Sequence, residues 1–215
     1  MDVKSIIAKR VALEFKDGDV INLGIGIPTL AADFIPPSVQ VILQSENGFV
    51  GLMPLSGEID PDTVNAGGKP VSIQPGGAVF DSAMSFAIIR GGHVAATVLG
   101  ALEVDQEGNL ANWMVPGKVV PGMGGAMDLV VGAKRVIIAM EHTAKGGAPK
   151  ILKKCTLPLT AKNEVDLIVT NLCVFEMTQE GLMLIELAPE VTLEEVKAAT
   201  EADYAVSETL KTMAL

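Results

Sequence analysis

The sequence is poor in the residues that most often bind metals. It contains two histidines and two cysteines among 215 residues, and His93, His142, Cys155 and Cys173 show no spacing typical of a metal site. Two cysteines are also too few for a disulfide framework, so we expect free thiols, most often buried, in a reducing compartment. A metal-binding protein and a disulfide-stapled secreted protein are therefore both disfavoured.

Positive charge is also scarce. The chain has 16 lysines and arginines against 26 aspartates and glutamates, a formal net charge of −10. Binding to nucleic acid depends on lysine and arginine neutralising phosphates, so this function is disfavoured. A phosphate-bearing ligand must instead be bound by local donors such as a few lysines or the N-termini of helices.

Long apolar runs are absent as well. The longest, such as residues 136–140, have the length of strands and fall far short of the ~20 residues that a membrane helix needs. The N-terminus carries charges throughout and does not resemble a signal peptide. We therefore expect no membrane association and a cytoplasmic location.

The residues that are abundant point to an α/β protein. Hydrophobic residues make up 49% of the chain and glycines number 22, which is typical of a buried sheet joined by tight turns. The length fits one domain over residues 1–215. The fold class that we predict is α/β, with an open, mostly parallel sheet, flanking helices and β-hairpin additions.

Local patterns predict the elements of this fold. Apolar residues at helical or strand spacing, together with Gly, Pro and capping signals, support the assignments. The predicted helices cover residues 3–16, 80–90 and 127–131, with a last helix beginning at a capping box of Thr192 and Glu195. The predicted strands cover 20–23, 39–43, 93–99 and 135–140, with hairpins over 102–113 and 172–187 and a long ordered loop over 51–75.

Glu46 is the candidate catalytic residue. It lies in Ser45-Glu46-Asn47-Gly48, directly after a predicted buried strand, and ligands of open α/β sheets bind at the carboxyl ends of the strands. A lone glutamate is usually a solvated surface charge, but this position suits catalysis. A carboxylate also suits an exchange reaction on a thioester, because replacing one carboxylate by another on the same thioester is nearly neutral in energy.

Two glycine clusters are candidate ligand sites. Gly24 and Gly26 follow a strand, and residues 122–125 precede a helix, so their backbone N–H groups could face an anionic ligand. The alternative is that both are simply tight turns. No Gly-x-Ser-x-Gly motif is present, which disfavours a serine hydrolase.

Taken together, these motifs resemble the B subunit of the class I, or 3-oxoacid, CoA-transferases. The similarity covers nearly the whole chain, and it is most specific in SENG at 45–48 and GMGGAMDLV at 122–130. The other matching segments read IAKRVALEFKDGDVINLGIGIPTL, VNAGGKP, FDSAMSFAIIRGGH, LANWMVPGK, MEHTAKG and KKCTLPLT.

The resemblance implies a mechanism. In that family the glutamate of SENG attacks acyl-CoA to give a mixed anhydride, which the released CoA thiolate converts into an enzyme glutamyl-CoA thioester. Glu46 would be this nucleophile, and the backbone N–H of Gly125 would help to hold the oxyanion. No metal and no tightly bound cofactor are implied, and coenzyme A is a co-substrate.

The resemblance also implies binding residues and partners. Lys69 matches a lysine that contacts CoA in relatives, and Asn47, Gly48 and Gly124 are the further residues expected to contact it. A partner A subunit, in a heterodimer or heterotetramer, and a fold of the CoA-transferase or sugar-isomerase type are expected. The substrates would be a short-chain acyl-CoA and an acid such as acetoacetate, acetate or butyrate, with a leaning toward the bacterial acetate or butyrate:acetoacetate type.

Two other functions stay open from the sequence. An acyl-CoA hydrolase on the same scaffold would also use Glu46 but would admit water to the acyl-enzyme. A non-catalytic, ligand-sensing module is the second alternative, because fold does not fix function. The intact SENG motif and the absence of an appended DNA-binding segment argue against the latter.

Overall fold

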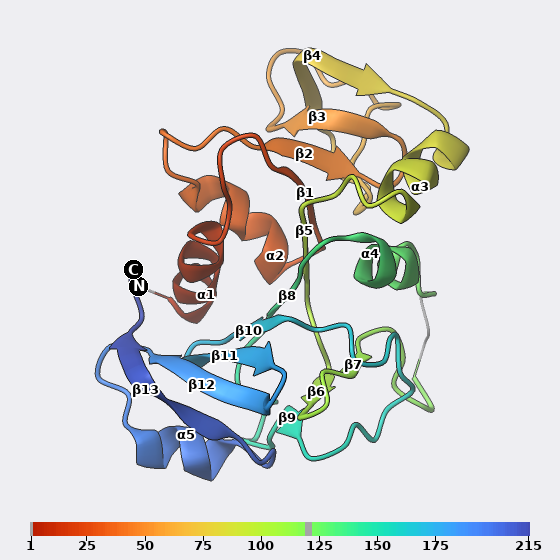
Figure 1. Cartoon of the computed structure of the whole chain (residues 1–215). Helices are drawn as coiled ribbons and strands as arrows, with labels where there is room; N and C mark the ends of the chain where they lie inside the picture. The colour runs from red at the N-terminus through yellow and green to blue at the C-terminus, as the bar shows by residue number, and fades with distance from the viewer. Residues whose placement is uncertain (1, 119–121) are drawn as a thin grey trace.

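The computed structural model describes residues 2–118 and 122–215 (Figure 1). Its helices are α1 (Val3–Ala12), α2 (Ile27–Leu30), the 3-10 helix η1 (Ala31–Phe34), α3 (Ser82–Arg90), α4 (Ala126–Gly132) and α5 (Leu193–Ala199). Its strands are β1 (Val20–Leu23), β2 (Ile42–Ser45), β3 (Phe49–Met53), β4 (Ser72–Val79), β5 (Ala96–Leu99), β6 (Glu103–Asp105), β7 (Leu110–Ala111), β8 (Val136–Ala139), β9 (Ile151–Leu152), β10 (Leu167–Val169), β11 (Cys173–Thr178), β12 (Gly181–Leu187) and β13 (Ala205–Thr212).

One large sheet organises the molecule. Its ten strands lie in the order β13-β12-β11-β10-β8-β5-β1-β2-β3-β4. The five central strands, from β10 to β2, pair in parallel, and the antiparallel pairs lie to either side. A second sheet has the order β7-β6-β9. The predicted fold class, an open and mostly parallel α/β sheet with hairpin additions, is confirmed.

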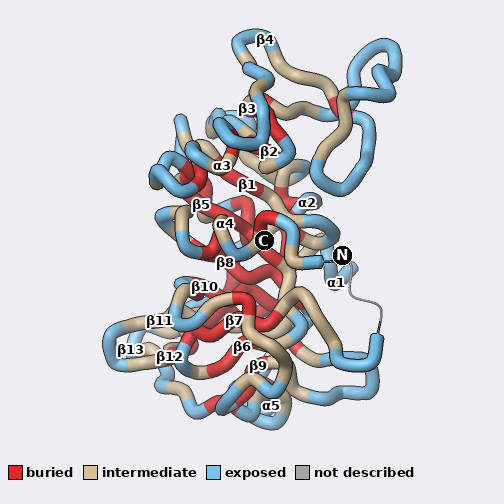
Figure 2. Tube along the Cα trace, turned by 90° about the vertical axis from the view of Figure 1, so that its right-hand side faces the viewer, coloured by how far each residue is buried: buried red, intermediate tan, exposed pale blue. Residues whose placement is uncertain are grey.

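The central strands are buried on both faces. Along β8, Val136 and Ile138 pack in a cluster with residues of α3 and α4, whereas Ile137 and Ala139 pack in a second cluster with residues of α1. This alternation follows from the two-residue period of a strand. Figure 2 shows the buried trace concentrated along these strands, which explains why their sequences read as continuous apolar runs.

Several element boundaries differ from the prediction. The predicted loop over 51–75 is wrong in part, because β3 extends to Met53 and β4 begins at Ser72. The second strand occupies Ile42–Ser45, not 39–43, so it ends immediately before Glu46. The predicted hairpins form as β6–β7 and β11–β12, and the capping box of α5 is present.

The strand order changes direction at β1. From β1 the chain continues to β2 on one side, and later returns to β5 on the other side. In open α/β sheets, ligands bind at the carboxyl ends of the strands beside such a switch. Gly24 follows β1 at this edge, and its N–H donates to the carbonyl oxygen of Val98 in β5 at 2.8 Å. The edge that carries Gly24 and Glu46 is therefore the place to look for a site.

Candidate active site

Glu46 lies at the carboxyl end of β2, half-buried. The side-chain amide of Asn22, on the neighbouring strand β1, donates from Nδ2 to Oε2 of Glu46 at 3.2 Å. Because β1 and β2 are parallel and in register, with Asn22 opposite Gln44, the amide reaches the residue just beyond the strand end. The carboxylate is thus held by a neutral donor, and no lysine or arginine in the described part of the chain forms an ion pair with it.

Gly125 contacts Glu46 from a distant part of the chain. It is buried at the N-cap of α4 with φ −83°, a conformation that any residue can adopt. A Cβ atom at this position would lie 3.0 Å from Cγ of Glu46 and 3.4 Å from its Cβ. A side chain at position 125 would therefore press on the glutamate, which would have to shift by a few tenths of an ångström. The structure brings these two predicted residues together.

Asn47 and Gly48 shape the turn that presents Glu46. The Ser45 hydroxyl donates to Oδ1 of Asn47, and Nδ2 of Asn47 donates to the Val64 carbonyl at 2.7 Å. Gly48 has φ +133°, and a Cβ there would lie 2.3 Å from the carbonyl oxygen of Phe80. Both residues therefore have a backbone-shaping role in the turn, whatever ligand they contact.

Lys69 lines a cavity of about 330 Å³ that begins beside the end of β2. Ser45, the residue before Glu46, is part of the lining, and most of the remaining wall is apolar, including Ile25 and Leu43. The loop that carries Lys69 is closed by Asn65, whose Oδ1 accepts from the backbone N–H groups of Gly67 and Lys69. The cavity thus brings Lys69 near Ser45, the residue before Glu46, while Glu46 itself is not part of the lining. Gly124 is exposed with φ +57°, directly before Gly125.

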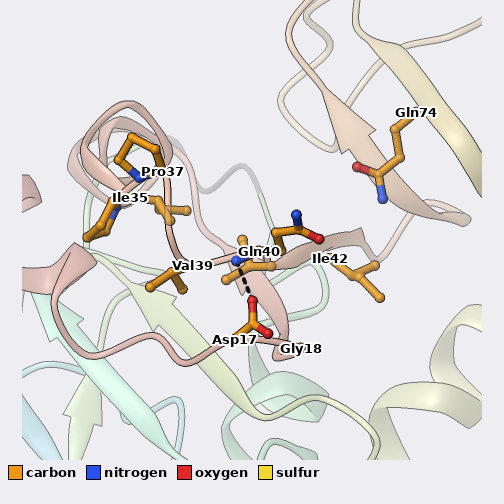
Figure 3. A pocket seen from close by; sticks show the side chains of 10 residues that line it. Asp17, Gly18, Ile35, Pro37, Val39, Gln40, Ile42 and Gln74 are labelled. Atoms are coloured by element: carbon orange, nitrogen blue, oxygen red, sulfur yellow. Dashed lines mark hydrogen bonds between the residues drawn. The ribbon is translucent and has the colours of Figure 1, made fainter.

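A second hollow lies at the opposite end of the strands. Its volume is about 480 Å³, and it is lined by residues that precede β1 and β2 and by Ile42 at the start of β2, with Gln74 of β4 across from them (Figure 3). Oδ1 of Asp17 accepts from the backbone N–H of Gln40 at 2.8 Å, so this acidic side chain of the lining is already engaged. The hollow lies at the amino edge of the sheet, away from Glu46.

The cysteines and the buried histidine are poorly suited to nucleophilic chemistry. Burial raises the pKa of the Cys173 thiol to about 12, and burial together with Asp105 does the same for Cys155, so neither forms a thiolate near neutral pH. Nδ1 of His142 lies 3.7 Å from Sγ of Cys173. Burial, followed by the charge of Lys150, lowers the pKa of His142 to about 4. Within residues 2–118 and 122–215, no group of His, Cys, Asp and Glu is arranged to hold a metal ion.

Sequence reasoning missed three residues of this site: Asn22, Gln44 and Ser85. They are 2%, 3% and 0% exposed and form hydrogen bonds to one another beneath Glu46. The available signal was the polar residues that follow apolar ones in two short strands, Asn22 in β1 and Gln44 in β2, since polar side chains are buried only when they are hydrogen-bonded.

The family was decided by comparison with known proteins. The family described as Coenzyme A transferase matches residues 4–199. The chain belongs to the coenzyme A transferase family. A relative in this family, the acetate CoA-transferase subunit beta of Haemophilus influenzae, is 60% identical over 214 residues, covering 99% of this chain and 96% of the relative.

Two longer relatives show where this chain fits in the family. The succinyl-CoA:3-ketoacid coenzyme A transferase 2B of mouse mitochondria is 56% identical over 96% of this chain but only 41% of the relative. The crystal structure of an acyl-CoA transferase from Escherichia coli O157:H7 superposes with a TM-score of 0.81 at 25% identity, covering 99% of this chain and 43% of that one. The chain thus spans less than half the length of these two proteins.

None of the helices in the described residues is long and apolar enough to cross a membrane.

Proposed function

We propose that this chain is the catalytic subunit of a CoA-transferase. It moves coenzyme A between a short-chain acyl-CoA and a carboxylic acid such as acetate, acetoacetate or butyrate. The observation that carries the proposal is the position of Glu46, a carboxylate at the carboxyl edge of the sheet that contacts Gly125 and accepts a hydrogen bond from Asn22.

The chemistry follows from the carboxylate. An oxygen of Glu46 attacks the thioester carbonyl carbon of acyl-CoA and forms a C–O bond. The C–S bond breaks, CoA leaves as the thiolate, and a mixed anhydride between the acyl group and Glu46 remains. The thiolate then attacks the Glu46 carbonyl carbon, which releases the first acid and forms a glutamyl-CoA thioester. The second acid reverses these steps, so no water is consumed. Covalent catalysis divides one difficult transfer into easier steps.

The surrounding residues support this assignment. Each attack develops negative charge on a carbonyl oxygen, and the backbone N–H of Gly125 is proposed to stabilise it. Lys69 is proposed to contact a phosphate or the pantetheine arm of CoA at the cavity beside Ser45. Asn47, Gly48 and Gly124 are the further proposed CoA contacts. No tightly bound cofactor enters the reaction.

A companion subunit is part of the proposal. The H. influenzae relative is named as one subunit of its enzyme, and the mouse and E. coli relatives carry more than half of their length outside the matched region. We propose that the A-type partner of a CoA-transferase supplies the equivalent of that region and completes the site over Glu46 in a heterodimer or heterotetramer. Such a partner would also supply part of the surface that binds CoA, which explains how a chain with a net charge of −10 can act on a polyanionic ligand.

The test separates transfer from hydrolysis. The chain is assembled with its companion subunit and supplied with acetoacetyl-CoA and isotopically labelled acetate. The expected product is labelled acetyl-CoA, formed in equal amount to acetoacetate. Release of free CoA with no labelled acetyl-CoA would favour an acyl-CoA hydrolase, and a lack of reaction with any short-chain acyl-CoA would refute catalysis.

A further inference from the structure

Three buried polar side chains connect helix α3 to Glu46. Asn22 of β1, Gln44 of β2 and Ser85 of α3 are together called the amide relay. Burying polar groups inside a sheet is costly unless each is hydrogen-bonded, and apolar residues of the same shape could fill this space at little cost. The polarity of the relay therefore calls for an explanation beyond packing.

The hydroxyl of Ser85 determines which end of each amide group in the relay donates a hydrogen bond and which end accepts one. It donates to the Ser45 carbonyl oxygen at 3.4 Å, and this leaves its lone pairs to accept from Nε2 of Gln44 at 3.1 Å. Gln44 consequently turns Oε1 toward β1, where Nδ2 of Asn22 donates to it at 2.8 Å.

The last step of the relay reaches the glutamate. Nδ2 of Asn22 carries two hydrogens, and it lies 2.8 Å from Oε1 and 3.2 Å from the backbone oxygen of Gln44. It also lies 3.2 Å from Oε2 of Glu46. One hydrogen is donated to the oxygens of Gln44, and the other is donated to the carboxylate of Glu46. If the Asn22 amide turned over, its Oδ1 would face Oε2 of Glu46, and two acceptors would repel each other.

We propose that Gln44 and Ser85 are positioning residues that hold the Asn22 amide with its N–H toward Glu46. This inference rests on the proposed nucleophilic role of Glu46. The relay keeps one carboxylate oxygen engaged and leaves the other directed at the thioester. Since small misplacements of a reacting group lower the rate strongly, the direction of a buried serine hydroxyl on α3 contributes to turnover.

The experiment is a double-mutant cycle on the enzyme assembled with its companion subunit. Ser85→Ala is expected to lower kcat for CoA transfer roughly tenfold while KM for both substrates stays within about twofold. In an Asn22→Ala background, Ser85→Ala is expected to cause no further fall, because the group through which Ser85 acts is already missing.

A matched control separates positioning from stability. Ile89→Val removes one buried methyl group from the same helix, and Ile89 is fully buried but belongs to no part of the relay. It should lower the melting temperature and leave kcat unchanged in both backgrounds. Ser85→Cys provides a second variant that keeps a side chain of similar shape but offers a weak acceptor; it should reproduce the kcat fall of Ser85→Ala.

The outcomes are distinct. An equal fall of kcat in both backgrounds overturns the inference, since Ser85 then acts only through the fold. An unchanged kcat in Ser85→Ala and Ser85→Cys also overturns it. If the wild-type enzyme transfers no CoA, the proposed function fails and the inference fails with it. If the wild type is active but the effects of the two substitutions are additive, only the positioning role of the amide relay is refuted.

Discussion

At the scale of single residues, Glu46 is held by contacts from two distant parts of the chain. Asn22 bonds one carboxylate oxygen from the neighbouring strand, and Gly125 packs against the side-chain carbons from the start of α4. In its proposed role as nucleophile, a side chain fixed in this way loses little freedom when the substrate binds. Such pre-organisation is a large part of what an active site contributes to rate.

Gly125→Ala is predicted to slow CoA transfer while preserving the fold. The added methyl would lie 3.0 Å from Cγ of Glu46, so the glutamate must shift, and a displacement of this kind costs roughly tenfold to a hundredfold in kcat. The φ of −83° is allowed for alanine, so thermal unfolding should change little. Steady-state kinetics and a melting curve check both parts; wild-type turnover in the variant would contradict the assigned contact.

His142 is predicted to make the protein sensitive to acid. The residue is 1% exposed, and its two ring nitrogens form hydrogen bonds with the hydroxyls of Thr170 and Thr200 at 3.0 and 2.9 Å. Burial and the charge of Lys150 lower its pKa from 6.5 to about 4 in the folded protein. Below pH 6.5 the imidazole of His142 becomes protonated in the unfolded chain but stays neutral in the folded chain. The contribution of His142 to the free energy of unfolding is therefore lost as the pH falls toward 4.

The expected size of this effect is about 2 kcal/mol of unfolding free energy between about pH 7 and about pH 5. Urea unfolding at the two pH values measures it. His142→Gln keeps a polar side chain but removes the titration, so its loss of stability over the same range should be smaller by about that amount. Equal losses in the two proteins would exclude His142 as the cause.

At the scale of elements, a buried ion-pair network joins the first helix to the last part of the sheet. Arg10 of α1 is 6% exposed and forms two hydrogen bonds to Glu186 of β12, at 2.6 and 2.9 Å, and one to Glu14. Glu14 also pairs with Arg135, directly before β8. The network ties α1 to two strands that are distant in sequence.

Arg10→Met is therefore predicted to destabilise the protein by about 3–5 kcal/mol, because the largely buried carboxylate of Glu186 would lose its partner and Glu14 would keep only Arg135. The matched control is Lys153→Met, which breaks the exposed pair between Lys153 and Asp203 and should cost about 1 kcal/mol or less. Denaturant unfolding of both variants makes the comparison. Similar costs for the two would show that the Arg10 network is not effectively buried.

The sequence predicted the central elements better than the edges of the sheet. Strands β1, β5 and β8 are apolar runs because both of their faces are buried, and such runs are easily recognised. Strand β4 contains Pro75, Gly76 and Gly77, which read as a loop, yet proline is tolerated at the edge of a sheet. Strand β13 is mostly exposed and polar, so it lacked an apolar signal.

The site was predicted in part for a related reason. Glu46 stands out because it lies in a cluster of turn residues directly after an apolar strand. Gly125 stands out because it ends a glycine-rich segment directly before a helix. Asn22, Gln44 and Ser85 carry no local motif, and only strand register and the packing of α3 bring them beneath Glu46. Contacts of this kind depend on tertiary structure, and spacing along the chain does not encode them.

At the scale of the whole molecule, the sheet edge carries the proposed nucleophile, Glu46, on one short turn. The proposed companion subunit would cover that edge and exclude water from the covalent intermediate. Exclusion of water is what separates a transferase from a hydrolase that uses the same carboxylate.

The most direct test of this account is to trap the intermediate. The enzyme assembled with its companion subunit is incubated with acetoacetyl-CoA and digested, and its peptides are examined by mass spectrometry, with Glu46→Gln treated in the same way. The account predicts a CoA thioester on the Glu46 peptide of the wild type that disappears when acetate is added, and none on the variant. Coenzyme A attached to another residue, or full transfer by Glu46→Gln, would contradict it.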